Sequence, residues 1–211
     1  MAAADFRERL LAGLGGDWPE PCPLNSQVLK TENTIIATGS SVTPLAGVTI
    51  DEKRIVSSTG ALELKKVPQT LVVVGAGVIG LELGSVYARL GTEITVVEFL
   101  DAITPGMDPE VQKTFQRMLK KQGINFVMGA AVQKTEVAKG KATVSYKLRK
   151  DDSEHEIEAD TVLVATGRKP VIKGMGLDDL GIQIQVIVDQ GVAQADDLVP
   201  WRTATVMVQA L

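Results

Sequence analysis

From residue 70 onward, short runs of apolar residues alternate with segments that have helical spacing. The runs are almost wholly apolar, as is typical of parallel strands that are covered on both faces. They are TLVVVG at 70–75, EITVVE at 93–98, INFVMG at 124–129 and TVLVATG at 161–167. This alternation of strand and helix predicts an α/β fold built on a parallel sheet.

Two helices are predicted between the first three runs. Val78–Leu90 ends before Gly91, a residue suited to a helix C-terminus, and Asp108 followed by Pro109 marks the start of the second helix. Gly123 ends that second helix. The apolar faces predicted from the spacing are Ile79, Leu83, Val86 and Leu90 in the first helix, and Val111, Phe115, Met118 and Leu119 in the second.

After the third run the apolar period changes from helical to two. Segments 131–137, 141–149 and 155–160 alternate, with turns expected at Lys139–Gly140 and Asp151–Asp152. We expect these segments to form an antiparallel β-meander. The fold class is therefore a Rossmann-like, three-layer α/β domain with a parallel sheet, helices and a meander.

The two ends of the chain differ from this central pattern. Residues 1–30 contain a short helix, predicted at about Asp5–Ala12, and a linker rich in glycine and proline. Residues 31–69 are interpreted as a crossover segment with a strand at Thr34–Thr38, residues 70–170 as the nucleotide-binding domain, and 171–211 as a tail. Within the tail, 182–188 alternate briefly and the later residues show no clear pattern.

Composition and charge exclude several classes of function. The net charge of −4 predicts no general attraction to nucleic acid or to an anionic membrane, and no apolar run is long enough to span a bilayer. A single cysteine, Cys22, allows no internal disulfide, and His155 is the only histidine. Neither a Ser-His-Asp mechanism nor a metal centre is therefore expected.

Gly75, Gly77 and Gly80 follow the first strand and open the first helix, which is the arrangement of a dinucleotide-binding turn. Gly75 permits the tight turn, Gly77 lets a diphosphate approach the backbone, and Gly80 lets the helix lie against the strand. Gly84, one turn later, is expected to extend that close contact. Unpaired N–H groups at the start of the helix would then bind the phosphates.

An acid ends the second strand at the place where a ribose-binding residue is expected. Glu98 comes 18 positions after Gly80, and its carboxylate can accept hydrogen bonds from both ribose hydroxyls. A carboxylate would repel the 2′-phosphate of NADP, and Phe99 rather than an arginine follows it. The sequence therefore favours NAD over NADP.

Residues from about 33 to 184 resemble one family, the dihydrolipoamide dehydrogenases. The resemblance is carried by the segments IIATGS, IVSSTGALELKKVP, VVVGAGVIGLELGSVYARLGTEITVVE, MDPEVQKTFQRMLKKQGINF and VLVATGRKP. Members of this family use FAD and NAD to oxidise dihydrolipoamide to lipoamide. The resemblance implies that this chain contains the NAD-binding domain of such a flavoprotein disulfide oxidoreductase.

The resemblance also implies roles for individual residues. Glu82 would reach toward the nicotinamide, Glu98 would hold the adenosine ribose, and Val132 would contact the adenine side. The implied NAD-binding residues are Gly75, Ala76, Gly77, Val78, Ile79, Gly80, Leu81, Glu82, Glu98, Val132 and Gly167. Those implied to lie at the edge of the FAD are Thr38, Gly39 and Ser40.

The chain also departs from the family, and these departures leave alternatives open. The redox-active cysteine pair, the glycine fingerprint for FAD and the catalytic His–Glu dyad are absent from the sequence. We expect NAD(H) binding without complete turnover, so the sequence leaves open whether the chain is an enzyme by itself. The alternatives are a non-catalytic interaction module that retains the fold, and a subunit completed by a partner chain that supplies FAD and a dithiol.

Surfaces that other domains cover in the family would be bare here, so we also expect self-association. Ile35, Ile36 and the apolar part of the tail are the candidates for that contact. The first residues carry Asp5 and Glu8 and show no clear targeting peptide. The resemblance implies a soluble protein of the mitochondrial matrix or of the bacterial cytoplasm.

Overall fold

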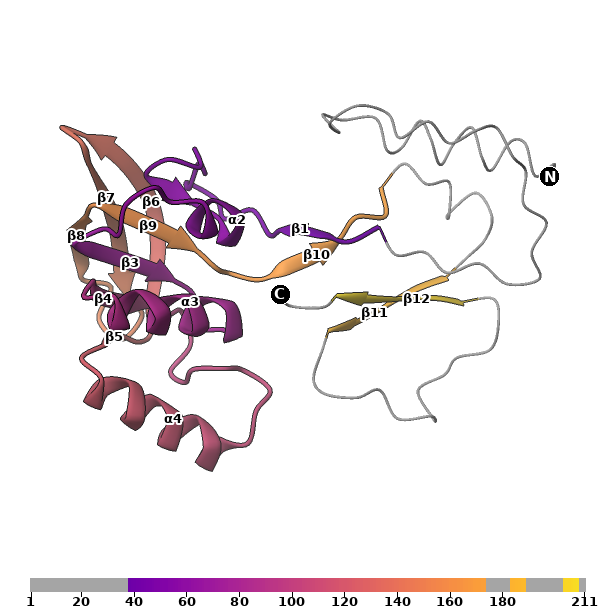
Figure 1. Ribbon diagram of the computed structural model, residues 1–211. Helices are drawn as coiled ribbons and strands as arrows, with labels where there is room; N and C mark the ends of the chain where they lie inside the picture. The colour runs from indigo at the N-terminus through magenta and orange to yellow at the C-terminus, as the bar shows by residue number, and fades with distance from the viewer. Residues whose placement is uncertain (1–37, 174–182, 189–202, 209–211) are drawn as a thin grey trace. The chain divides into compact units, whose positions relative to one another are not determined.

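The computed structural model describes residues 38–173, 183–188 and 203–208 (Figure 1). Spatial contacts divide the chain into two units, Val42–Arg168 with Ala210–Leu211, and Met1–Ser41 with Lys169–Gln209. The first unit contains the parallel sheet, its helices and the meander. The helix predicted at Asp5–Ala12 and nearly all of the strand predicted at Thr34–Thr38 lie outside the described residues.

A five-stranded parallel sheet forms the centre of the first unit. Its strands, in spatial order, are β2 (Ile55–Val56), β9 (Thr161–Val164), β3 (Thr70–Val74), β4 (Glu93–Val97) and β5 (Asn125–Val127). Every neighbouring pair is parallel, and Val74 lies opposite both Val97 and Val164. The apolar runs of the sequence are therefore confirmed as parallel strands. The sheet also includes β2, which precedes residue 70.

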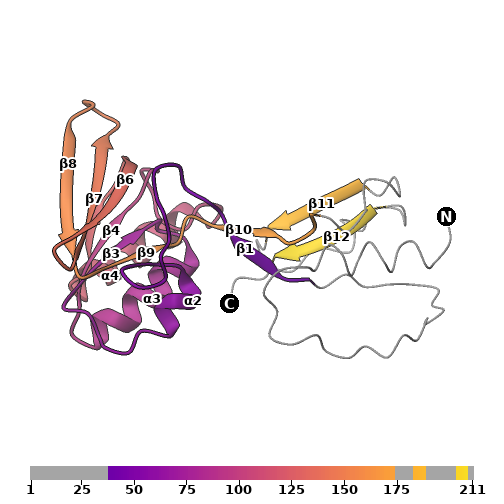
Figure 2. The same cartoon turned by 90° about the horizontal axis from the view of Figure 1, so that it is seen from above.

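Alternate residues of β3 point into two different hydrophobic clusters. Leu71 and Val73 pack with residues of the helices, whereas Val72 and Val74 pack with residues of the meander. The helices are α2 (Ser58–Leu62), α3 (Val78–Arg89) and α4 (Pro109–Lys121), and the meander strands are β6 (Ala130–Ala138), β7 (Lys141–Leu148) and β8 (Glu154–Ala159). Figure 2 shows the sheet between the meander and the helices, which confirms the three-layer α/β fold.

The meander has the pairing expected from its period of two. β6 pairs with β7 and β7 with β8, both antiparallel, and Lys139 and Asp152 adopt positive φ at the two turns. The register shifts between Val132 and Lys134, which marks a bulge in β6.

The buried face of α3 differs from the predicted one. Val86 and Leu90 are 45% and 57% exposed, whereas the helix buries Gly80, Leu81, Gly84 and Tyr87. A Cβ at Gly80 would lie 2.3 Å from the carbonyl oxygen of Gly75 and 3.0 Å from Val73 Cγ1. The helix therefore lies on the sheet through its glycines, a face that a count of apolar side chains does not detect.

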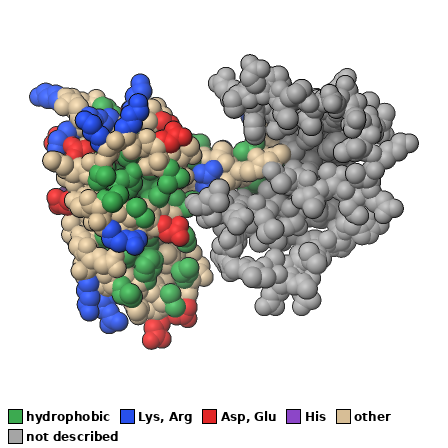
Figure 3. Space-filling view, viewed as in Figure 1, with side chains coloured by type: hydrophobic (Ala, Val, Ile, Leu, Met, Phe, Trp, Pro, Cys, Tyr) green, Lys and Arg blue, Asp and Glu red, His purple; other side chains and the backbone are tan. Residues whose placement is uncertain are grey.

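Helix α4 begins and ends where the sequence predicts. The Asp108 carboxylate accepts hydrogen bonds from the N–H groups of Glu110 and Val111, at 2.8 and 3.3 Å. Of the predicted apolar face only Leu119 is fully buried, since Val111 and Met118 are about half exposed. Figure 3 shows apolar side chains gathered on the face that carries α3 and α4.

Two small sheets lie outside the central one. β1 (Ser40–Val42) pairs with β10 (Arg168–Pro170), and β11 (Gln183–Val188) pairs in parallel with β12 (Thr203–Val208). β11 lies in the stretch that alternates briefly in the sequence, whereas β12 falls where the sequence shows no clear pattern.

We predict that Gly80→Ala destabilises the protein and that Gly84→Ala does not. A Cβ at Gly80 meets backbone that cannot move without disturbing the turn, so the free energy of unfolding should fall by about 1–3 kcal/mol. A Cβ at Gly84 meets Val73 and Ile94 at ordinary contact distances of 3.6 and 3.7 Å. Alanine there should be neutral, or should stabilise the helix by up to about 1 kcal/mol. Urea unfolding followed by circular dichroism measures both, and equal effects would contradict this packing.

A second prediction concerns Asp160, whose carboxylate joins the starts of β9 and β3. Its Oδ2 accepts from the N–H groups of Gln69 and Thr70 at 3.0 and 3.1 Å. Burial raises the pKa of Asp160, but these hydrogen bonds and the nearby Lys141 outweigh burial and hold the pKa below its usual value. The stabilisation is therefore present above about pH 4 and is lost as the pH falls through the lowered pKa.

Asp160→Asn should accordingly lower the free energy of unfolding by about 1 kcal/mol at pH 6. The difference from the unmodified protein should shrink between about pH 4 and pH 2. Glu158→Gln, at an exposed position of the adjacent strand β8, is the control. A difference that does not depend on pH would rule out the ionised carboxylate as its source.

Candidate functional site

The order in which strands are added to the sheet reverses between β3 and β9, and the carboxyl ends of these two strands lie side by side. From β3 the chain continues to β4 on one side, while β9 occupies the other side. In open α/β sheets ligands bind at such a point. Gly75 leaves β3 with φ +104°, and a Cβ there would lie 2.5 Å from the carbonyl oxygen of Ala165. Glycine is required because the conformation and the close neighbouring strand both exclude a side chain.

Gly77 is the residue that leaves room for a ligand. It caps α3 in an extended conformation that any residue adopts, and no atom lies within 4 Å of the position of a Cβ. The first helical hydrogen bond runs from Leu81 N to Gly77 O, at 3.1 Å. The N–H groups of residues 77–80 find no acceptor in the described part of the chain. Free donors at a helix N-terminus form a site for an anion such as a diphosphate.

Glu98 is buried against this loop, with only 8% of its surface exposed. Its Oε2 accepts a hydrogen bond from Ala76 N at 2.6 Å, and its Oε1 accepts one from Leu100 N at 2.8 Å. Two oxygens offer about four lone-pair positions, so two remain for further donors. The structure therefore brings the predicted ribose acceptor to the glycine-rich turn and shows a second task for it, which is to hold the turn.

A further residue holds the same turn and was missed by the sequence analysis. Thr104, in the connection between β4 and α4, donates its backbone N–H to the carbonyl oxygen of Ala76 at 2.8 Å. It is 2% exposed and adopts φ +45°. The only signal in the sequence is the turn-forming pair Pro105–Gly106 that follows it.

The other expected NAD-binding residues lie on several different elements. Gly167, with φ +115°, comes two residues after Ala165, which packs against Gly75. Val132 is half-buried in β6, two residues after Ala130, whose N–H donates to the carbonyl of Glu98 at 2.8 Å. Glu82 is exposed on α3, and no described residue bonds its carboxylate. Val78, Ile79 and Leu81 form the first turns of α3.

The residues expected at the FAD edge lie beside β10. Thr38 Oγ1 donates to the carbonyl of Val171 at 2.5 Å, and Gly39, with φ +77°, accepts from Val171 N at 3.0 Å. Ser40 begins β1. These three belong to the second unit of the chain, whereas the glycine-rich turn belongs to the first.

An arginine lies beside Phe99 in space, although none follows Glu98 in the sequence. The guanidinium of Arg149 lies 4.7 Å from the centre of the Phe99 ring, and its Nη1 donates to the Phe99 carbonyl at 3.0 Å. The same nitrogen is 3.8 Å from the carboxylate of Asp101. Arg149 thus places a cation over Phe99, the residue that follows Glu98, and its guanidinium is engaged by a carbonyl and a carboxylate.

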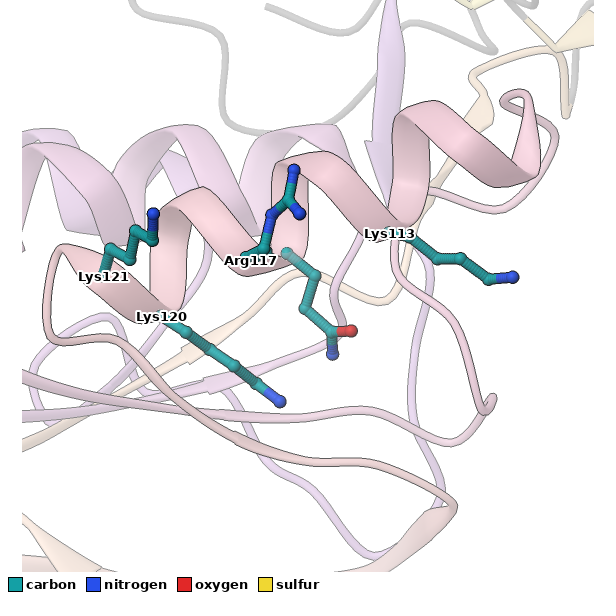
Figure 4. Close-up of a pocket in the computed structure, with 5 residues that line it drawn as sticks. Lys113, Arg117, Lys120 and Lys121 are labelled. Carbon is teal, nitrogen blue, oxygen red and sulfur yellow. The ribbon is translucent and has the colours of Figure 1, made fainter.

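A shallow depression on α4 does not have the features of a binding site. It is lined by Lys113, Gln116, Arg117, Lys120 and Lys121. Figure 4 shows that the four labelled cations fan out from the helix instead of converging on one point. Lys120 and Lys121 thus belong to the solvent-exposed face of α4.

His155 is exposed on the meander strand β8. Its ring stacks on Tyr146, and its Nε2 lies 2.8 Å from Ser153 Oγ. That hydroxyl donates to Asp151 at 2.6 Å, so the ring nitrogen must be the donor to Ser153. Within the described ranges no three acidic, histidine or cysteine side chains gather as metal ligands, and no helix is long and apolar enough to cross a membrane.

Comparison with known proteins agrees with this geometry. A family model described as pyridine nucleotide-disulphide oxidoreductase matches residues 22–199. The chain is 51% identical over 164 residues to a dihydrolipoamide dehydrogenase of Chaetomium thermophilum, and 51% identical over 161 residues to the human mitochondrial dihydrolipoyl dehydrogenase. Each alignment covers 75% of this chain and 32% of the relative. The chain thus spans about a third of the length of these curated relatives.

Solved structures show the same likeness. LpdA from Mycobacterium tuberculosis superposes with a TM-score of 0.63 at 28% identity, over 71% of this chain and 31% of that one. The HOCl-induced flavoprotein disulfide reductase RclA from Escherichia coli superposes with a TM-score of 0.62 at 25% identity, over 82% and 38%. The family model extends beyond residues 33–184, where the resemblance was seen in the sequence, at both ends.

We predict that Gly77→Ala leaves the fold intact and weakens dinucleotide binding. The new methyl group meets no protein atom. Alanine is a poorer helix cap than glycine, which lowers the free energy of unfolding, but it also makes the unfolded chain less flexible, which raises it. These two effects should offset each other to within about 1 kcal/mol. The methyl group would occupy the space through which a diphosphate reaches the backbone, so the affinity for NADH should fall at least about tenfold. Calorimetric titration and thermal melting measure the two effects, and unchanged NADH binding would contradict this role of Gly77.

Proposed function

Because the chain belongs to the pyridine nucleotide-disulphide oxidoreductase family, we propose that its parallel-sheet unit binds NAD(H). The proposal makes this unit the pyridine-nucleotide domain of a dihydrolipoamide dehydrogenase-like flavoprotein. The observation that carries it is the turn at Gly77, which has an open space, four N–H groups without an acceptor among the described residues, and a buried carboxylate bonded to the neighbouring Ala76 N–H. The family reaction is the oxidation of dihydrolipoamide to lipoamide, with NAD⁺ reduced to NADH.

The residues of the turn fit the dinucleotide in two places. The N–H groups from Gly77 onward would receive the diphosphate at the positive end of α3. The two lone-pair positions that remain on Glu98 would accept the hydroxyls of the adenosine ribose. NAD⁺, once bound, supplies the acceptor for a hydride, and the residues of this unit bind and orient it.

Glu98 is also the residue that would select NAD over NADP. A 2′-phosphate beside its carboxylate would be repelled, by about 1–4 kcal/mol for two charges 4 Å apart near a protein surface. The guanidinium of Arg149 is engaged by the Phe99 carbonyl and lies 3.8 Å from the Asp101 carboxylate. The preference for NAD therefore depends on Glu98 more than on the absence of a cation.

The proposal assigns FAD no residue beyond Thr38, Gly39 and Ser40. The described part of the chain contains one glycine-rich phosphate loop, and this loop fits the pyridine dinucleotide. Cys22 is the only cysteine of the sequence, so a dithiol partner of the flavin is not among these residues. The partner chain, self-association and the location in the matrix or bacterial cytoplasm stay predictions, and Ile35 and Ile36 lie outside the described residues.

We predict that the protein binds NADH at least about tenfold more tightly than NADPH, because only NADPH places a phosphate against the Glu98 carboxylate. Glu98→Gln should narrow the ratio of the two affinities, because it weakens the binding of NADH and removes the charge that repels NADPH. Calorimetric titration of both dinucleotides measures the ratio.

Glu93→Gln, at the opposite end of β4, is the matched control and should leave both affinities unchanged. Equal affinity of the unmodified protein for the two dinucleotides would contradict the selectivity assigned to Glu98. No heat with either dinucleotide would favour the non-catalytic interaction module over NAD(H) binding.

A further inference from the structure

We propose that Thr104 is a positioning residue of the dinucleotide-binding turn, acting through the carbonyl group of Ala76. This inference rests on the proposed NAD(H) function, since it concerns the direction of the N–H group that would meet the diphosphate. The backbone N–H of Thr104 acts through the bond of 2.8 Å to Ala76 O.

The peptide group between Ala76 and Gly77 is planar and links the directions of its two polar groups. In a trans peptide the C=O and the following N–H lie in one plane and point in opposite directions. Thr104 fixes the direction of the Ala76 carbonyl, so it also fixes the direction of the Gly77 N–H. That N–H points away from the β4–α4 connection and has no acceptor in the described residues.

The peptide between Gly75 and Ala76 likewise has its N–H and its C=O pointing in opposite directions. The Ala76 N–H points to the Glu98 carboxylate, at 2.6 Å. The carbonyl of Gly75, on the other side of that peptide, points toward α3, because it lies 2.3 Å from the position of a Cβ on Gly80. Both polar groups of Ala76 are therefore held by the segment that follows β4, and both peptides of the turn are oriented by it.

Thr104 is itself held in an unfavourable conformation. A β-branched residue rarely adopts positive φ, and such residues persist only where their surroundings enforce them, often beside ligand sites. The surroundings here are the side chain of Gln112 on α4, whose Nε2 donates to the Thr104 carbonyl at 2.9 Å, and Met107 N, which donates to the same oxygen at 3.2 Å. Gln112 therefore supports Thr104, and Thr104 supports the turn.

A variant without the hydroxyl group of Thr104 distinguishes a role of the backbone from a role of the side chain. Its Oγ1 is buried without a hydrogen-bond partner in the described residues. Thr104→Val keeps the shape of the side chain and the backbone N–H, and removes only this hydroxyl. If Thr104 acts through its backbone, as the bond to Ala76 indicates, this variant should bind NADH as the unmodified protein does.

The decisive variant is Gln112→Ala, which removes the support of Thr104 without changing any residue of the turn. We expect the amide resonance of Gly77 to shift in a ¹⁵N–¹H spectrum, and the NADH affinity to fall about threefold to tenfold, the worth of one hydrogen bond. Gln116→Ala is the matched control, since Gln116 is equally half-buried one turn further along α4 and makes no bond to Thr104. It should change neither quantity.

Thr104→Gly is expected to retain the role of Thr104, because glycine keeps the backbone N–H and adopts positive φ freely. Its NADH affinity should remain near that of the unmodified protein, even if loss of the buried side chain lowers its melting temperature. A structural role alone would instead make affinity follow stability in both Gln112→Ala and Thr104→Gly.

An unmoved Gly77 amide in Gln112→Ala would overturn the role of Thr104. So would an unchanged NADH affinity in a variant whose Gly77 amide has moved, or a loss of affinity in Thr104→Val equal to that in Gln112→Ala. Titration of the unmodified protein with NADH tests the proposed function separately. If that protein does not bind NADH, the result counts against the proposed function whatever the Gly77 amide shows.

Discussion

The fit of α3 against β3 depends on one missing side chain. At Gly80 even a methyl group would overlap the carbonyl oxygen of Gly75 and press on Val73. Only glycine lets the helix begin this close to the end of the strand. The N–H groups of its first turn, which have no partner within any helix, therefore lie at the carboxyl end of β3. The proposed ligand site and the packing of the core therefore share a single steric requirement.

The second requirement is electrostatic. A carboxylate as buried as that of Glu98 loses the stabilisation of water, and such a loss must be offset by hydrogen bonds. The N–H groups of Ala76 and Leu100 provide two of them. The acid thus stabilises the turn while its remaining lone pairs stay available, which couples the shape of the phosphate loop to the residue that would read the ribose. A dinucleotide preference and a loop conformation cannot be altered independently in such an arrangement.

Much of the fold could be predicted because parallel strands covered on both faces are continuously apolar. β3, β4 and β9 were found for this reason, and the meander was found from its period of two. The buried face of α3 was predicted wrongly because Gly80 and Gly84 make the contact, and glycine has no hydrophobic side chain to reveal it. β12 was missed because its pairing with β11 is decided by a strand some twenty residues away. Of the candidate site, the turn and Glu98 were predicted, while Thr104 and Arg149 were not.

The sequence by itself determined the turn and its acid, because these depend on local spacing, three glycines at a strand end and a carboxylate at the end of the next strand. Tertiary structure alone decided that the Glu98 carboxylate holds the Ala76 N–H, that Thr104 holds the Ala76 carbonyl, and that Arg149 lies over Phe99. These contacts join residues separated by whole helices and strands. Their formation depends on the register of the sheet and on the position of α4, and no local pattern of residues records either.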